Sequence, residues 1–190
     1  MNTQSVSVTN KSAMRALIPL IIFLGMAALL FYGLQLDPRK VPSPLIGKPA
    51  PMFELESLEE PGRLVSSDML FGRVSLVNIW ASWCPSCRQE HGELMVIARD
   101  HPDLQVIGFN WKDTRPEALR MLRQYGNPYV VSAYDPDNRY GLHWGVYGAP
   151  ETFIVDGEGI IRYKHIGPVD QTVWETKIRP IVEKYTPKAS

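Results

Sequence analysis

The sequence predicts an α/β fold, a mixed sheet flanked by helices, preceded by a single transmembrane helix. First, segments rich in β-branched and aromatic residues alternate with segments of good helix formers between residues 74 and 133. Second, two further apolar segments separated by Asp156-Gly157-Glu158-Gly159 indicate a hairpin. Third, residues 16–34 are uncharged and mostly apolar. These observations predict one ordinary domain attached to a membrane helix.

The N-terminal apolar stretch is close to the roughly 20 residues that span a bilayer and longer than the core of a typical signal peptide. No small-x-small cleavage site follows it, so the sequence favours an uncleaved anchor over a cleaved signal peptide. Basic residues flank the stretch equally, and the lack of acids before it favours a cytoplasmic N-terminus. The predicted segments are a cytoplasmic tail at 1–15, a transmembrane anchor at 16–36, a proline-rich linker at 37–44 and the domain at 45–190.

Within the domain, the pattern of apolar residues and turn residues places each element in order. A short strand pair is expected first, then a buried central strand that runs into a helix, and then further strands and helices. The predicted strands are 49–55, 64–65, 74–80, 104–110, 129–133, 152–155 and 160–164. The predicted helices are 88–99, 116–125 and 171–183, and a turn is expected at 135–138.

Both cysteines lie in the segment Cys84-Pro85-Ser86-Cys87, where the central strand gives way to a helix. A helix N-terminus favours an anion, and the thiolate is the nucleophilic form of cysteine. Cys84 is therefore predicted to be the exposed attacking thiol, with Cys87 one helical turn away as the buried resolving thiol. A purely structural disulfide is the alternative, but such a short loop restricts the unfolded chain little.

A metal site competes with the redox interpretation, because Cys84, Cys87 and His91 have the spacing C-x2-C-x3-H. Structural zinc requires about four ligands, and the chain has no second cysteine pair. Copper binding by two thiolates and a histidine stays open. An exposed helical histidine is more often solvated, so no metal ligand is predicted.

The overall charge excludes one class of partner. Lysine and arginine together number 20, and aspartate and glutamate also number 20. This balance gives no basic surface of the kind that nucleic-acid-binding domains use. No nucleic-acid partner is expected.

Three segments together narrow the interpretation to a family. Residues 76–87, with Trp83 just before Cys84, resemble the active-site strand and turn of thioredoxin. The chain is also similar to the membrane-tethered thiol:disulfide interchange proteins of cytochrome c maturation, the CcmG/DsbE type. The similarity lies in residues 88–91, 108–113 and 145–153 and in the N-terminal anchor.

This resemblance implies a thioredoxin-like sheet and a periplasmic domain held on the bacterial inner membrane. It implies a thiol:disulfide oxidoreductase that reduces a disulfide of apocytochrome c, or of its haem-ligation partner. A membrane thiol-electron donor would then return the enzyme's own disulfide to the reduced state. The only redox group implied is the Cys84–Cys87 disulfide, with no further cofactor.

The resemblance also assigns residues to substrate binding. Pro150 matches the family's cis-proline, whose loop lies against the active site, although an ordinary turn proline is the alternative. The implied substrate-binding residues are Trp83, Pro85, Ala149, Pro150 and Glu151. Glu151 could instead face solvent.

One departure from thioredoxin bears on proton transfer. Thioredoxin usually has a buried aspartate six residues before the first cysteine, whereas this chain has Asn78, which cannot exchange a proton. Glu90 lies one turn beyond Cys87 and matches an acid of the cytochrome c maturation family. Glu90 is therefore predicted to be the base for Cys87, with a solvated carboxylate as the alternative.

Three functions remain to be distinguished. A disulfide reductase is favoured. A copper chaperone on the same fold, serving a membrane oxidase, is the second hypothesis, but such chaperones usually space their cysteines C-x3-C. A scaffold in which the cysteines are incidental is the third.

Overall fold

The computed structural model describes residues 11–34 and 43–186, which form two separate units. The first is helix α1 (Lys11–Leu34). Its residues 17–34 have a mean hydropathy of 2.4, and none of them is buried. By length and composition α1 can cross a membrane. Residues 1–10 of the predicted tail, 35–36 of the predicted anchor and 37–42 of the predicted linker lie outside the described residues.

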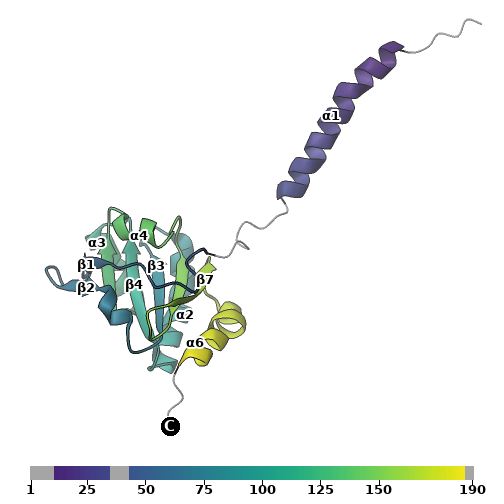
Figure 1. Ribbon diagram of the computed structural model, residues 1–190. Helices are drawn as coiled ribbons and strands as arrows, with labels where there is room; N and C mark the ends of the chain where they lie inside the picture. Colours follow the sequence, from purple (N-terminus) through teal and green to yellow (C-terminus); the bar gives the residue numbers. More distant parts are fainter. Residues whose placement is uncertain (1–10, 35–42, 187–190) are drawn as a thin grey trace, which may run out of the picture. The chain divides into compact units, whose positions relative to one another are not determined.

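The second unit is built on a five-stranded mixed sheet in the order β5-β4-β3-β6-β7 (Figure 1). The central strands β3 and β4 and the edge strand β5 run parallel, while β6 is antiparallel to both β3 and β7. The strands are β3 (Ser75–Trp80), β4 (Gln105–Trp111), β5 (Val131–Asp135), β6 (Glu151–Val155) and β7 (Ile161–Ile166). The predicted mixed sheet with flanking helices is confirmed.

Shorter elements and helices complete the domain. A separate antiparallel pair is formed by β1 (Glu54–Glu56) and β2 (Leu64–Ser66), followed by the 3-10 turn η2 (Ser67–Leu70). The helices are α2 (Pro85–Asp100), α3 (Arg115–Tyr125), α4 (Arg139–His143), α5 (Gln171–Val173), the π-helical turn η3 (Trp174–Ile178) and α6 (Arg179–Tyr185).

The sheet separates two hydrophobic cores. Because side chains alternate along a strand, Leu76 and Trp80 of β3 pack against α2, α3 and the C-terminal helices, on what we call the α2 face. Val77 and Ile79 of β3 point to the opposite side, the α4 face, which is covered by β2, η2 and Trp144. All four of these side chains are buried, so β3 is enclosed on both sides.

Helix α2 begins at Pro85, three residues before its predicted start. Cys84 has extended backbone angles and occupies the N-cap position, and Pro85 occupies the first turn. Proline suits that place because the first N–H groups of a helix have no partner within it. The redox motif is therefore part of the helix N-terminus itself.

The C-terminal helical segment is interrupted, contrary to the uninterrupted helix predicted at 171–183. Between α5 and α6 the chain forms the π-helical turn η3. Pro180 lies two residues beyond this turn. It lacks an N–H and would clash with the carbonyl group of Thr176 in a regular helix. The wider turn accommodates this proline.

Helix α4 is a second element absent from the prediction. It follows the turn predicted at 135–138 and contains only five residues. The carboxylate of Asp135 accepts hydrogen bonds from the backbone N–H groups of Arg139, Tyr140 and Gly141, which satisfies its first turn. This cap depends on tertiary folding, because Asp135 belongs to β5.

Candidate active site

Cys84 and Cys87 form a disulfide at the end of β3, with their Cα atoms 5.3 Å apart. The Sγ atom of Cys84 accepts a hydrogen bond from the backbone N–H of Cys87 at 3.1 Å. When the pair is reduced, the same N–H and the dipole of α2 stabilise a thiolate on Cys84. The geometry thus supports Cys84 as the nucleophilic sulfur.

Both cysteines are buried in this oxidised state. Cys84 is 3% exposed and Cys87 is 2% exposed, so the expectation of an exposed Cys84 is wrong for the disulfide form. The physical reason is the loop before β6, whose Ala149 carbonyl oxygen lies 3.4 Å from Cys84 Sγ. A substrate disulfide must therefore approach Cys84 past this loop.

The covering loop contains the predicted cis-proline. The Ala149–Pro150 peptide bond is cis, as the resemblance implied. Strand pairing places Glu151 opposite Ile79 of β3, so Pro150 comes next to the turn that carries the cysteines. Trp83 and Pro85 are exposed and Ala149 is half-buried, whereas Pro150 is buried.

Glu90 is buried, and its alternative role as a solvated carboxylate is excluded. It is 2% exposed and lies on the α2 face. One carboxylate oxygen accepts a hydrogen bond from Asn78 Nδ2 at 2.8 Å, and the other accepts one from the Val169 backbone N–H at 2.8 Å. Burial raises the pKa of Glu90 to about 7, although both hydrogen bonds oppose the rise.

Two residues that sequence reasoning did not single out support this carboxylate. The hydroxyl group of Tyr129 donates to Asn78 Oδ1 at 2.8 Å. Asn78 Nδ2 also donates to Thr152 Oγ1 at 3.2 Å. The tyrosine lies two residues before β5, far from the cysteines in sequence, and no local pattern signals its role.

Glu151 is buried on the other side of the sheet. It is 0% exposed and alternates with Thr152, so its side chain shares the α4 face with Phe153. Its carboxylate lies 2.9 Å from Lys164 Nζ in a buried ion pair. Burial raises its pKa, and the charge of Lys164 opposes the rise. Both the solvent-facing alternative and direct contact with a docked substrate are therefore inconsistent with its position.

Lys164 connects this ion pair to the loop that covers the disulfide. Besides its contact with Glu151, its Nζ atom donates to the carbonyl oxygen of Gly145 at 2.9 Å. The Glu151 carboxylate accepts a hydrogen bond from the Tyr147 backbone N–H at 3.4 Å. The pair therefore fixes both ends of the segment 145–151.

His91 is buried rather than solvated, which corrects its expected position. Its Nε2 atom lies 2.9 Å from the Gly126 carbonyl oxygen, and its ring lies edge-on to Tyr125 and Tyr129. Burial lowers its pKa. Within residues 11–34 and 43–186, no three cysteine, histidine or acidic side chains are arranged to hold a metal ion.

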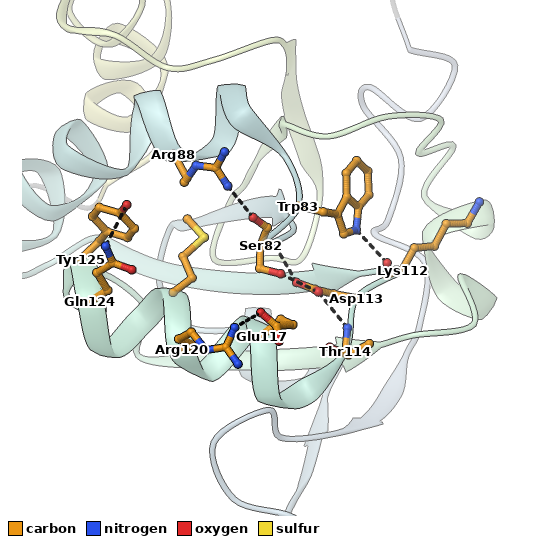
Figure 2. A pocket seen from close by; sticks show the side chains of 11 residues that line it. Ser82, Trp83, Arg88, Lys112, Asp113, Thr114, Glu117, Arg120, Gln124 and Tyr125 are labelled. Atoms are coloured by element: carbon orange, nitrogen blue, oxygen red, sulfur yellow. Dashed lines mark hydrogen bonds and ion pairs between the residues drawn. The ribbon is translucent and has the colours of Figure 1, made fainter.

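The turn that carries the cysteines is also tied to the loop after β4, beside a cavity of about 460 Å³ (Figure 2). The Asp113 carboxylate accepts hydrogen bonds from the backbone N–H and hydroxyl groups of Ser82. The Trp83 indole N–H donates to the Lys112 carbonyl oxygen at 2.8 Å. These bonds hold Trp83 in place although its side chain is about half exposed.

The chain is similar to known proteins over most of its length. The model of the Redoxin family matches residues 45–179. The chain is 69% identical over 176 residues to the thiol:disulfide interchange protein DsbE of Allochromatium vinosum, covering 93% of this chain and 97% of that protein. It is 48% identical over 180 residues to DsbE of Escherichia coli K12, covering 92% and 96%.

A solved structure gives the same result for the fold. A protein from Chlorobium tepidum, described as a thiol:disulfide interchange protein of the DsbE kind, superposes with a TM-score of 0.62 at 27% identity. The match covers 73% of this chain and 96% of that one.

Proposed function

The chain belongs to the DsbE-type thiol:disulfide interchange proteins, which carry a Redoxin domain, and we propose that it reduces a disulfide of apocytochrome c, or of its haem-ligation partner, during cytochrome c maturation. The observation that carries the proposal is the Cys84–Cys87 disulfide at a helix N-terminus, covered by the loop that contains cis-Pro150. Once this pair is reduced, the thiolate of Cys84 can attack a substrate disulfide that is brought against the loop.

In the first step the thiolate of Cys84 attacks one sulfur of the substrate disulfide. A new disulfide forms between Cys84 and that sulfur, the substrate S–S bond breaks, and the other substrate sulfur leaves as a thiolate that takes up a proton. The N–H of Cys87 and the N-terminus of α2 favour the attacking thiolate.

In the second step Cys87 resolves the mixed disulfide. Its thiol loses a proton and attacks the sulfur of Cys84, which releases the second substrate sulfur and re-forms the Cys84–Cys87 bond. A thiol with a pKa of about 8.5 is mostly protonated at neutral pH, so a proton acceptor is needed. Glu90 lies one helical turn beyond Cys87, and a pKa of about 7 suits it to accept that proton near neutral pH.

The surface around the disulfide supplies the proposed substrate contacts. Trp83 and Pro85 are exposed, and Ala149 offers its backbone beside Cys84. Pro150 shapes this loop from a buried position. Glu151 acts indirectly, because its ion pair with Lys164 holds the loop in place.

The proposed cellular setting follows from α1 and the family. Residues 16–36 anchor the chain in the bacterial inner membrane, and the domain from residue 45 onward lies in the periplasm. Disulfides persist in that compartment, so substrates are present there. A membrane thiol-electron donor returns the Cys84–Cys87 pair to the reduced state after each turnover.

The test measures holocytochrome c in cells that lack the chromosomal copy of the gene and express the chain or its variants. We expect Cys84→Ser to abolish assembly, an added small thiol to restore it, and Ser86→Ala to behave as the wild type. Normal assembly with Cys84→Ser would contradict the proposal. Restoration by copper and not by thiol would support copper delivery instead.

A further inference from the structure

Tyr129 is buried on the α2 face and fixed by its ring. It is 6% exposed and stacks on Trp80, with ring centroids 5.4 Å apart and planes inclined by 17°. This stacking aims the hydroxyl group at the side chain of Asn78, 2.8 Å away. The ring therefore holds the hydroxyl group in one position.

Gly108 of β4 makes room for this arrangement. A Cβ atom at Gly108 would lie 2.9 Å from Tyr129 Cγ and 2.8 Å from Trp80 Nε1. Real Cβ atoms do not approach neighbours this closely, so any larger residue would displace the stacked pair. The backbone of β4 and the position of Tyr129 are thus matched to each other.

The amide group of Asn78 can face Glu90 with either of its two ends. In the structure Oδ1 accepts from Tyr129, so Nδ2 is turned toward Glu90, to which it donates at 2.8 Å. If the amide turned over, Oδ1 would face Glu90 and could accept a hydrogen bond from the neutral carboxylic acid. After that turn the Tyr129 hydroxyl group would have to accept from Nδ2, and its own O–H would have no acceptor among the described residues, so the buried hydroxyl group opposes the turn.

We propose that Tyr129 is a positioning residue that holds Asn78 with its N–H groups toward Glu90 and thereby keeps Glu90 in the charged form. The proposal rests on the proposed role of Glu90 as the base for Cys87. Tyr129 itself touches neither the sulfur atoms nor a substrate. It acts through Asn78.

The hydrogen-bond donors around Glu90 explain why the orientation of the Asn78 amide group affects the charge of Glu90. Both carboxylate oxygens face N–H donors, from Asn78 and from Val169, and these favour the charged form against the cost of burial. No lysine, arginine or histidine among the described residues forms an ion pair with Glu90. The titratable groups around this network are Cys87 and His91 on α2, Tyr129 itself, and Glu59, whose charge acts on Tyr129.

The first experiment measures the pKa of Glu90 directly, by carbon NMR of the side-chain carboxyl groups in the full chain in detergent micelles. The protein is kept oxidised so that the cysteines do not titrate, and Glu90→Gln identifies the signal. We expect Tyr129→Phe to raise the pKa of Glu90 by about one unit, the scale of one hydrogen bond to a charged group. An unchanged pKa overturns the proposal.

Two controls separate the hydroxyl group from general effects. Tyr125→Phe removes a hydroxyl group from the end of α3, close to His91, and should leave the pKa unchanged. In an Asn78→Ala background, Tyr129→Phe should have no further effect, because the connecting side chain is gone. The same shift in both backgrounds overturns the proposal, since Tyr129 would then act without Asn78.

A measurement on the unmodified chain keeps the proposal testable even if Tyr129→Phe does not fold. The side-chain NH₂ signals of Asn78 should shift with pH at the same midpoint as the Glu90 carboxyl group, with both protons protected from exchange. Rapid exchange, or no pH-dependent shift, overturns the proposed contact.

The kinetic consequence distinguishes this inference from the proposed function. In Tyr129→Phe the pH profile of the resolving step should move upward by the same amount as the pKa of Glu90. If the pKa moves and the profile does not, Glu90 is not the base, while the positioning by Tyr129 is supported. If neither moves, the positioning itself is wrong.

Discussion

Glu90 and Glu151 are two equally buried acids on opposite faces of one sheet, and their partners differ in charge. Glu90, on the α2 face, is held by the neutral N–H donors of Asn78 and Val169. Glu151, on the α4 face, lies against the ammonium group of Lys164. Burial raises the pKa of both, but only Glu151 has a cation that opposes it.

The comparison shows that the protonation balance of a buried carboxylate depends on the charge of its partner as well as on burial. A buried acid with a cation stays charged and serves as a fixed structural contact. A buried acid with neutral donors sits closer to the balance between its two protonation states, which is the condition for accepting and returning a proton. Each of the following changes tests one side of this difference.

The largest effect is expected from removing the cation. Lys164→Met leaves the Glu151 carboxylate buried without a charged partner, and we expect the free energy of unfolding to fall by about 3–5 kcal/mol. Urea denaturation measures this, with exposed Lys177→Met as a control that should change little. A further Glu151→Gln substitution should recover part of the loss. A loss below about 1 kcal/mol would show that the pair is not buried.

The next effect concerns the stability of the oxidised protein as a function of pH. The folded state raises the pKa of Glu90 from 4.5 to about 7, so it binds this proton more tightly than the unfolded state does. The stabilisation is complete below pH 4.5 and is lost as the pH rises to about 7, a change of about 3 kcal/mol.

Glu90→Gln carries no titrating group and should lack this decline. The difference between the wild-type and variant curves isolates Glu90 from Glu151 and His91, whose contributions are common to both. Parallel curves between pH 4 and pH 8 would mean that the pKa of Glu90 is not raised.

A kinetic change of about a hundredfold, the lower end of the usual range for general acid–base catalysis, is expected from the same substitution. Glu90→Gln should slow the release of a chromophoric thiol from a mixed disulfide on Cys84 at pH 7, while the first attack by Cys84 stays nearly unchanged. The defect should shrink as the pH rises and the Cys87 thiol ionises without help.

The matched control is Glu93→Gln, one turn further along α2 and partly exposed. It should leave both steps unchanged. Equal slowing of the two steps by Glu90→Gln would assign Glu90 to the general field around the cysteines. No slowing would remove it from the mechanism.

The smallest effect is expected at Thr152, the second acceptor of the Asn78 amide. Thr152→Val preserves the shape of the side chain but removes this acceptor, and we expect a loss of about 1 kcal/mol in unfolding free energy. Exposed Thr176→Val on the last helical segment serves as the control and should cost less. An equal cost at both positions would show that Asn78 does not depend on Thr152.

Much of the fold could be predicted because it depends on local patterns. The apolar central strand, the helix that begins at the cysteines and the hairpin before the last helix each have a signal within a dozen residues of sequence. The sequence pattern does not predict the π-helical turn, although Pro180 lies two residues beyond it. The reason is that a proline can also end or kink a helix.

The surroundings of the two acids could not be predicted, because they depend on pairs of residues far apart in the chain. The hydrogen bond between Glu90 and Asn78 joins residues 12 positions apart in the sequence. The bond between Asn78 and Tyr129 spans 51 positions, and the bond between Glu90 and Val169 spans 79. These contacts depend on strand order and register, which cannot be deduced from sequence spacing alone.

The face on which Glu151 lies illustrates the same limit. Alternation along β6 shows that Glu151 and Thr152 point to opposite sides, but not which side holds the cysteines. Its partner Lys164 also depends on the irregular pairing of β6 with β7. The family resemblance placed Glu151 near the active site and did not reveal the intervening sheet.

The position of β6 beside β3 has a consequence for how the chain is made. During synthesis the cysteines emerge early, whereas Ala149, which covers Cys84, follows 65 residues later. Until β6 pairs with β3, that edge of β3 is open and the loop before β6 does not cover the cysteine pair. Strands so distant in sequence pair slowly. The cysteine pair therefore stays without this cover until the chain has been made past residue 149.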